Sequence, residues 1–528
     1  KPSLAQIRSP FSMKGIKRAV ERIFAAIRNR EKILIFGDFD TDGITATALL
    51  LEFLRSLEAD VDYYIPNRLT EGYGLSRRYV EEQAIPNGLD LIITVDCGIS
   101  SHEAVSTAKD AGIDVIITDH HETSSHTPEA IAVLDPKQPD CPSGFSWLAG
   151  VGVAFNLAMA LRKRLRDEGY WEDRPEPNLK AACDLVALGT VADMVPLVDE
   201  NRIYVRAGIE VLRSQMRPGI KALLDVSNSV HRHIETQDLS YKIAPRLNAA
   251  GRLRDASTAL RLLTTSEKEE AKVIALELND ENTRRQKIER DILSGIDQSL
   301  KAHPSLLQQR ALVLDHQDWH QGVIGIVASR LVDRYHRPVV LIAVADGIGK
   351  GSARSPSGFD VHDGLKRCAK HLERFGGHKR AAGLSLKSEN ISAFRRDFES
   401  IVEKTTEPED LIPKLVIDGE IKSSDVSGTL ADELEAFAPF GNGNPEPLFM
   451  LSDMKVMSSR LVGTSHLRLR LTPRSTHRPE PIDAIYFNGA TEGVNCSNVH
   501  QIACHVRWNR WRNSKRLQLV IRDMDRFS

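Results

Sequence analysis

Three aspartates at alternate positions stand directly after an apolar run near the start of the chain. The run KILIFG leads into Asp38, Asp40 and Asp42, and Gly43 follows them. In an extended chain alternate side chains share one side, so we expect the three carboxylates to lie close together. Like charges that close raise one another's pKa unless a cation neutralises them, which favours a divalent metal site. The alternative is a solvated turn in which Asp42 caps the following helix.

The same arrangement recurs further along the chain. Asp96 follows the run LIITV, and Asp119, His120 and His121 follow the run VIIT. Asp193 stands in a short turn, ALGTVADMVPL, after an apolar helical run. One such residue alone is more often a turn, cap or structural residue. Because ligands gather at the carboxyl ends of parallel strands, the repetition at three strand ends favours one shared site.

The residue types at these positions indicate the chemistry. Aspartate oxygens with one or two imidazoles form a hard oxygen and nitrogen donor set that suits Mn²⁺ or Mg²⁺, and no soft sulfur favours zinc or copper. Two such ions about 3.5 to 4 Å apart would activate a bridging water and neutralise charge on a phosphoryl group. The sequence therefore predicts phosphoester hydrolysis with two divalent cations as cofactors.

The elements that must position these residues follow from the apolar pattern. Between residues 32 and 135 short apolar runs alternate with amphipathic stretches, which is typical of a parallel sheet covered on both faces. We therefore expect a doubly wound α/β domain. The stretch from about 148 to 300 reads as helical and ends in a long charged helix, which either joins two domains or packs on one lobe. A second, smaller α/β unit follows near 310, and short strands beyond 414 predict a small β-barrel.

Two glycine-rich stretches of the second α/β unit, GKGSARSPSG and RFGGHKRAAG, combine backbone amides, hydroxyls and a guanidinium. Such groups together form a phosphate cradle. A pair of ordinary glycine-rich turns is the alternative. The candidate substrate contacts are Ser352, Arg354, Ser355, Gly376, Gly377 and His378.

A stretch near the C-terminus, HVRWNRWRNSKRLQLVIR, interleaves tryptophans with basic residues. Aromatic faces stack unpaired bases while cations follow the backbone of a single strand. A basic hairpin with partly buried tryptophans is the alternative. The candidate nucleic-acid contacts are Arg507, Trp508, Arg510 and Trp511, with Arg512, Lys515 and Arg516 beside them.

The overall composition excludes several classes of protein. Seventy basic and 72 acidic residues give a net charge of -2, so any nucleic-acid surface must be local. Six scattered cysteines without a C-x-x-C pair predict neither a zinc site nor a disulfide framework. No apolar stretch approaches the roughly 18 residues of a membrane span, and the start lacks the apolar core of a signal peptide. We therefore expect a cytoplasmic protein with no membrane partner, and Lys1 in place of Met indicates a processed or trimmed terminus.

Four motifs, DFDTDG, VDCG, TDHHE and GTVADMVPL, resemble in this order those of the DHH phosphoesterase superfamily. The resemblance implies that His121 faces the scissile phosphate. Related pyrophosphatases carry a ligand histidine four residues before the position of Asp40, where this chain has Phe36, and this departure favours the nuclease branch. The implied metal ligands are Asp40, Asp42, Asp96, His120 and Asp193, with Asp38 and Asp119 supporting or sharing them.

Downstream segments are similar to those of the RecJ family. RFGGHKRAAG contains the GGH-x-x-AAG motif of the DHH-associated substrate domain, and DWHQGVIGIVASRL and PFGNGNPEP also resemble RecJ segments. APRLNAAGRL carries Arg246, Asn248 and Arg252, of which the two arginines either contact phosphate or brace two domains. The family has a longer segment before Ser9, so this chain resembles a truncated or short-leader member.

The RecJ resemblance implies a metal-dependent exonuclease that degrades single-stranded DNA 5′→3′ to 5′-mononucleotides in DNA repair and recombination. It also implies a monomer that meets a helicase or a single-strand-binding protein. The predicted units are a DHH domain, a helical connector, a substrate-binding domain and an OB-type nucleic-acid-binding barrel, over residues 1–210, 211–305, 306–405 and 406–528.

Two alternatives remain, one in the same functional class and one in a different class. A phosphodiesterase for short RNA or cyclic dinucleotides has the same chemistry, but such small enzymes usually consist of the two α/β units alone, so the barrel favours a long polymer. A noncatalytic single-strand-binding protein on a decayed DHH fold is the other alternative, and the retained carboxylates and both histidines argue against it.

Overall fold

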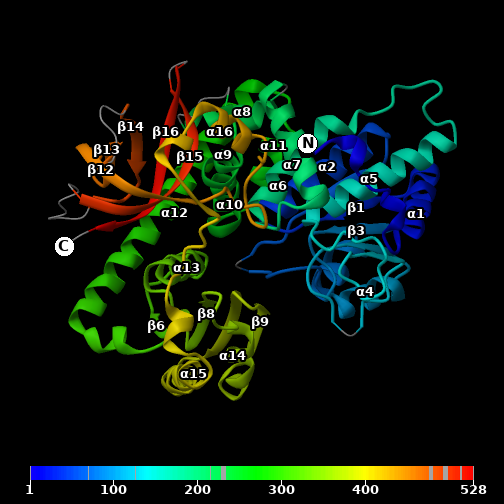
Figure 1. Cartoon of the computed structure of the whole chain (residues 1–528). Helices are drawn as coiled ribbons and strands as arrows, with labels where there is room; N and C mark the ends of the chain where they lie inside the picture. Colours follow the sequence, from blue (N-terminus) through cyan, green and yellow to red (C-terminus); the bar gives the residue numbers. More distant parts are fainter. Residues whose placement is uncertain are drawn as a thin grey trace.

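Three sheets carry the apolar runs of the chain in this computed structural model (Figure 1). The first sheet lies in the blue and cyan part, the second in the yellow-green part, and the third in the orange and red part. The fold class predicted from the sequence is confirmed. The structure describes residues 2–68, 70–124, 126–214, 216–227, 233–474, 480–490, 498–511 and 514–526.

The first sheet is parallel throughout, with the strand order β2-β1-β3-β4-β5. Along β1, Ile33 and Ile35 face a core shared with helices α1, α2 and α5, whereas Leu34 and Phe36 face α3 and α4. Helices therefore cover both faces, as in other doubly wound sheets. The strands are β1 Ile33–Phe36, β2 Val61–Tyr64, β3 Leu91–Val95, β4 Asp114–Thr118 and β5 Ala132–Leu134. The helices are α1 Ile16–Asn29, α2 Thr41–Ser56, α3 Arg77–Tyr79, α4 His102–Asp110 and α5 Gly150–Asp167.

A helical region follows and ends in the 35-residue helix α12 (Figure 1). Ala271 and Ile274 in the first half of α12 belong to the core of the first sheet, and Ile292 and Ile296 in its second half pack with the second sheet. The long helix therefore joins two cores instead of packing on one lobe. None of the described helices is both long and apolar enough to cross a membrane. The helices here are α6 Cys183–Ala192, α7 Asp199–Ser214, α8 Pro218–Val226, α9 Thr236–Asp238, α10 Ala244–Leu253, α11 Ser257–Thr264 and α12 Lys268–Ala302.

The second sheet has the order β6-β7-β8-β10-β9, in which only the β6–β7 pair is parallel. Helix α13 and the end of α12 cover one face, and α14 and α15 cover the other. The strands are β6 Leu312–His316, β7 Val339–Ala345, β8 Ile348–Arg354, β9 Arg374–His378 and β10 Ala381–Lys387. The helices are α13 Ile324–Tyr335, α14 Val361–Arg367 and α15 Ile391–Thr405.

The third sheet closes on itself, because β12 pairs with both β13 and β15 while β14 pairs with β16. This closure makes the small β-barrel that the sequence predicts. Helix α16, Gly428–Glu435, packs on its core. The strands are β11 Gly419–Ile421, β12 Phe449–Val462, β13 His466–Pro473, β14 Ile482–Tyr486, β15 Asn498–Trp511 and β16 Ser514–Arg526.

Candidate metal centre

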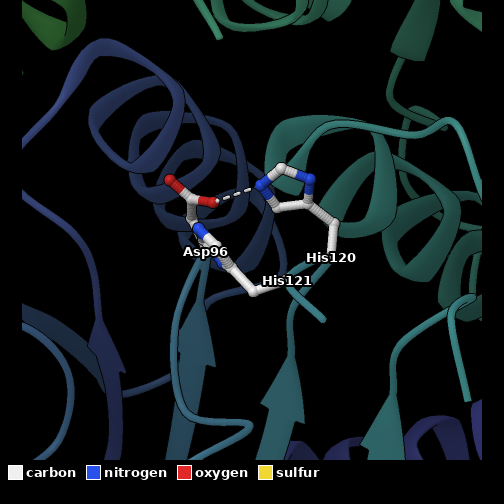
Figure 2. Close-up of side chains that lie close together, drawn as sticks. All are labelled: Asp96, His120 and His121. Carbon is white, nitrogen blue, oxygen red and sulfur yellow. Dashed lines mark ion pairs between the residues drawn. The ribbon is translucent and has the colours of Figure 1, made fainter. Parts of the chain in front are cut away.

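The carboxyl ends of β1, β3 and β4 meet at one edge of the first sheet and bring their polar side chains together. His120 Nε2 lies 3.0 Å from Asp96 Oδ1, 3.8 Å from Asp42 Oδ2 and 3.7 Å from Asp193 Oδ2. Figure 2 shows the His120 ring facing the Asp96 carboxylate above the strand ends. Donor atoms within 4.8 Å of one another form three groups: Asp96, His120 and His121; Asp42, His120 and Asp193; and Asp38, Asp40 and Asp96.

Backbone amides hold several of these carboxylates in place. Asp40 precedes α2 and accepts hydrogen bonds from the amides of Asp42 and Gly43, at 2.9 and 3.2 Å. Asp42 accepts from the amides of Gly150 and Val151 at the start of α5, at 2.6 and 2.9 Å. The alternative in which Asp42 caps the following helix is therefore wrong, because Asp40 is the N-cap residue of α2 and the Asp42 carboxylate contacts the start of α5 instead.

Two glycines allow the site to close around the carboxylates. A Cβ at Gly150 would stand 2.6 Å from Asp96 Oδ1, and one at Gly189 would stand 2.8 Å from Asp42 Oδ1. Real Cβ atoms do not approach that closely. The helices α5 and α6 can therefore lie against the aspartates only because glycine stands at these positions.

The positive groups near the buried aspartates do not offset the effects of burial and mutual repulsion on their pKa values. Burial, and then the neighbouring Asp40, raise the pKa of Asp38 well above its usual range and raise that of Asp42 to about 7. Burial, and then the charge of Asp42, raise the pKa of Asp96 and of Asp193 well above normal. Ionised carboxylates so placed repel one another strongly, and a divalent cation removes the repulsion.

Several buried polar atoms at the site make no hydrogen bond. Asp38 Oδ1, Asp96 Oδ1 and both ring nitrogens of His120 have no hydrogen-bond partner among the described residues. His120 and Asp96 are 3.0 Å apart, yet the contact lacks hydrogen-bond geometry. Burial, and then His121, lower the pKa of His120 to about 3, so its ring is neutral and offers a lone pair. Unsatisfied oxygens beside a neutral imidazole fit a bound Mn²⁺ or Mg²⁺.

His121 has a different environment from His120. Its Nδ1 lies 2.7 Å from Asp119 Oδ1 and 3.0 Å from the hydroxyl of Tyr73, which itself donates to the Asp96 carbonyl at 2.9 Å. Burial alone would lower the pKa of His121, but the hydrogen bond with Asp119 outweighs it and raises that pKa to about 9. The His121 ring therefore carries a positive charge at neutral pH, and its Nε2 makes no hydrogen bond with the described residues, so it can meet an anion.

The second sheet reaches this site from the opposite side. The His378 ring at the end of β9 stacks on His121 with ring centroids 6.2 Å apart. A cavity of about 490 Å³ lies between the two lobes, and its lining includes Arg68, Lys350, Arg374 and Gly376. The lobes therefore form the two walls of a cleft whose polar lining is basic.

Arg68 lines this cavity, and Arg252 and Arg354 lie close enough for its charge to act on them. Among the described residues no carboxylate forms an ion pair with any of these three arginines. Burial, and then the charge of Arg68, lower the pKa of Arg252 to about 9 and that of Arg354 to about 10. Positive groups that repel one another in this way form a site for an anion such as phosphate. Arg68 and Tyr73 lie in a loop without a recognisable motif, so sequence reasoning missed both.

Other predicted contacts serve the scaffold in this structure. Asn248 Oδ1 accepts from the Thr41 amide and hydroxyl at 2.8 and 2.9 Å and so holds the start of α2. Arg246 donates to the Lys242 carbonyl and to Asn279, which both belong to the helical region, so these contacts hold that region together and do not join two domains. These side chains are therefore engaged within the protein and not presented to the cleft.

The glycine-rich stretches divide between cleft and scaffold. The Ser352 hydroxyl accepts from Arg354 at 2.9 Å, which holds that guanidinium in place. The buried Ser355 hydroxyl donates to the Phe359 carbonyl at 2.8 Å and is satisfied there. Gly376 lines the cavity, whereas a Cβ at Gly377 would strike Ala381 and Ala382.

The basic hairpin of the barrel is paired with acidic side chains. Arg507 pairs with Glu446 and Arg510 with Glu435, and Trp508 Nε1 donates to Asp432 at 2.8 Å. Lys515 lies over the Trp508 ring and also reaches Asp432. These groups therefore fasten the hairpin to α16 and the turn at Glu446, and in this conformation they are not a free platform for bases. The side chain of Trp511, and Arg512, lie outside the described residues.

Comparison with known proteins identifies the family. The DHH family N-terminal domain matches residues 32–190, the DHHA1 domain 308–404 and the RecJ OB domain 417–523. The single-stranded-DNA-specific exonuclease RecJ of Salmonella typhimurium is 40% identical over 530 residues, which cover 97% of this chain and 90% of that protein. The chain belongs to the RecJ family. The resemblance found in the motifs is thereby confirmed.

The RecJ similarity extends through the whole chain but not through the whole of every relative. The RecJ of Bacillus subtilis is 38% identical over 98% of this chain, which spans 64% of the length of that relative. The crystal structure of RecJ in complex with Mn²⁺ from Thermus thermophilus superposes with a TM-score of 0.83 at 30% identity. The superposition covers 100% of this chain and 73% of the RecJ chain in that crystal structure. The three-sheet architecture therefore matches the corresponding part of that RecJ structure.

Metal affinity should depend on pH. Because Asp42 has a pKa of about 7 and its neighbours are also raised, protons compete with the cation. We expect Mn²⁺ affinity to fall as the pH drops below about 7, and binding near neutral pH to release protons. Isothermal titration in buffers of different ionisation enthalpy measures both effects. A Mn²⁺ affinity that stays the same from about pH 6 to about pH 8 would contradict the prediction.

The same shifts predict how stability changes in the metal-free protein. A carboxyl whose folded pKa is raised destabilises the fold when it ionises, so stability should fall as the pH rises from about 4 to about 7. Mn²⁺ should restore that stability, mainly at the upper end of this range. Thermal melting with chelator and with Mn²⁺ across this pH range tests whether the stability of the metal-free protein falls as the pH rises.

Gly150→Ala should damage the metal centre. The added methyl would press on Asp96 Oδ1, so we expect metal affinity to fall about tenfold or more. Gly295→Ala in α12 is the matched control, since a Cβ there meets nothing within 4 Å. That variant should gain about 0.5–1 kcal/mol of stability and keep its metal affinity. Equal metal affinity in the two variants would refute the close-approach argument.

Proposed function

We propose that this chain is a metal-dependent exonuclease that degrades single-stranded DNA 5′→3′ and releases 5′-mononucleotides, in DNA repair and recombination. The observation that carries the proposal is the cluster of unsatisfied buried carboxylates and imidazole at the strand ends, near which stand three arginines without a carboxylate partner in the described part of the chain. The cluster suits two divalent cations, and the arginines suit phosphate. Relatives named as single-stranded-DNA-specific exonucleases at about 40% identity support the substrate.

Two groups of donors would hold the cations. When bound, two divalent ions supply an activated water and neutralise charge on the phosphoryl group. His121 adds a fixed positive charge, because Asp119 accepts its Nδ1 proton and leaves Nε2–H for a phosphate oxygen. The donors are Asp42, His120 and Asp193 in one group, and Asp38, Asp40 and Asp96 in the other.

The second lobe would grip the strand near its end. Arg354 of the second lobe, held by Ser352, would contact phosphates beyond the scissile one, together with Arg252 at the end of α10, which is held by the Gly322 carbonyl of the second lobe. His378 would cover the bound nucleotide, since its ring already stacks on His121. We also propose a cytoplasmic monomer that works with a helicase or a single-strand-binding protein.

Substitution of single residues should separate metal binding from turnover. Asp193→Ala should lower cleavage at least about 100-fold while binding of an oligomer is largely kept, because Asp193 contributes to one donor group only. His121→Ala should lower turnover by about 100-fold or more with Mn²⁺ affinity little changed. A folded Asp193→Ala protein with wild-type manganese-dependent cleavage would refute the metal assignment. Loss of manganese as the main effect of His121→Ala would refute the separate role of that histidine.

End polarity is tested with DNA oligomers blocked at one end. A 5′ block should abolish release of mononucleotides and a 3′ block should not, because the proposed grip acts on the 5′ end. The same assay with a dinucleotide tests the phosphodiesterase alternative, which predicts faster hydrolysis of the dinucleotide than of the oligomer.

A further inference from the structure

Among the proposed carboxylate ligands, Asp193 is neither hydrogen-bonded to backbone amides nor nearly completely buried in the described structure. Asp40 and Asp42 each accept hydrogen bonds from two backbone amides. Asp38 and Asp96 are nearly completely buried. The Asp193 carboxylate receives no hydrogen bond from the described residues, and its side chain is 24% exposed. Its position therefore depends on the backbone where α6 ends.

That backbone is in an unfavourable conformation. Met194, the residue after Asp193, has φ of +62°, in the left-handed region that is disfavoured for side chains with a Cβ and is usually taken by glycine after a helix. The Met194 side chain is 72% exposed, so its own packing does not stabilise this conformation. Something outside the segment must hold it.

The turn PFGNGNPEP, which precedes the barrel strand β12, supplies that contact. Asn442 Nδ2 donates to the Met194 carbonyl at 2.7 Å, and the Leu197 amide donates to the Asn442 carbonyl at 2.7 Å. The turn also packs closely on the segment, since a Cβ at Gly441 would stand 2.7 Å from Leu197 and one at Gly443 would stand 2.8 Å from Pro196. Asn442 thus bonds to both ends of the backbone that leaves Asp193, from a position 248 residues after Met194.

We propose that Asn442 is a positioning residue for the metal centre, through which the barrel holds the Asp193 carboxylate in its place. The inference rests on the proposed role of Asp193 as a metal ligand. It assigns the barrel a second role beside contact with nucleic acid: the metal centre in the first lobe is fully formed only when the turn before the barrel is docked on it.

Asn442→Ala tests the proposal in the full-length, metal-free protein. The variant loses the side-chain donor, so Mn²⁺ affinity measured by isothermal titration should weaken about fivefold, the effect of one lost hydrogen bond. The matched control is Thr236→Val, which removes a 2.8 Å hydrogen bond from α9 to the Phe440 carbonyl of the same turn. Thr236 makes no hydrogen bond to the segment after Asp193, so this variant should keep wild-type Mn²⁺ affinity.

A second substitution tests the mechanism. Glycine takes the left-handed conformation without steric cost, so Met194→Gly in the Asn442→Ala background should recover part of the lost affinity. Equal losses of Mn²⁺ affinity in Asn442→Ala and Thr236→Val would overturn the proposal. Looser docking of the whole turn, and not the lost Asn442 hydrogen bond, would then explain the weaker binding. Wild-type affinity in Asn442→Ala would also overturn it.

Asp193→Ala distinguishes this failure from failure of the proposed function. If Asp193→Ala binds Mn²⁺ as tightly as the wild type, the metal assignment itself is wrong. If Asp193→Ala weakens binding and Asn442→Ala does not, only the positioning role is wrong.

Discussion

Repulsion among carboxylates buried at the ends of three parallel strands is the constraint on which the rest of this structure depends. Burial raises the pKa of Asp38, Asp42, Asp96 and Asp193, and oxygens of two of them have no hydrogen-bond partner among the described residues. An interior of this kind is stable only with protons or cations in it. Hydrogen bonds from backbone amides fix the Asp42 carboxylate, and the glycines of α5 and α6 let these helices lie against the aspartates. The carboxylates are thereby held in positions where they can bind a cation.

The second lobe complements that negative site with positive charge. Arg354 of the second lobe and Arg252 at the end of α10 are buried, and burial lowers the pKa of each, so an anion bound beside them would stabilise their charged forms. In the proposed function, a phosphodiester would meet the bound cations on one side and these guanidinium groups on the other. Helix α12 contributes to the cores of both lobes and so fixes the width of the cleft (Figure 1).

Local patterns in the sequence were sufficient to predict the sheets and the strand-end residues. A buried parallel strand is a continuous apolar run, and its carboxyl end faces the site. They were insufficient where partners lie far apart in the chain. The pairing of Arg510 with Glu435 arises only when α16 packs on the barrel, and the contact of Asn442 with Met194 arises only when the turn before the barrel docks on the first lobe. Arg68 stands in a loop with no motif, and only the folded cleft shows its place.

The central claim is that the strand-end cluster holds two divalent cations. Anomalous diffraction from crystals of the protein grown with Mn²⁺ measures this directly, because manganese scatters anomalously and protein oxygens do not. The account predicts two anomalous peaks, one contacted by Asp42, His120 and Asp193 and one contacted by Asp38, Asp40 and Asp96. An anomalous map with no peak within coordination distance of His120 would contradict it.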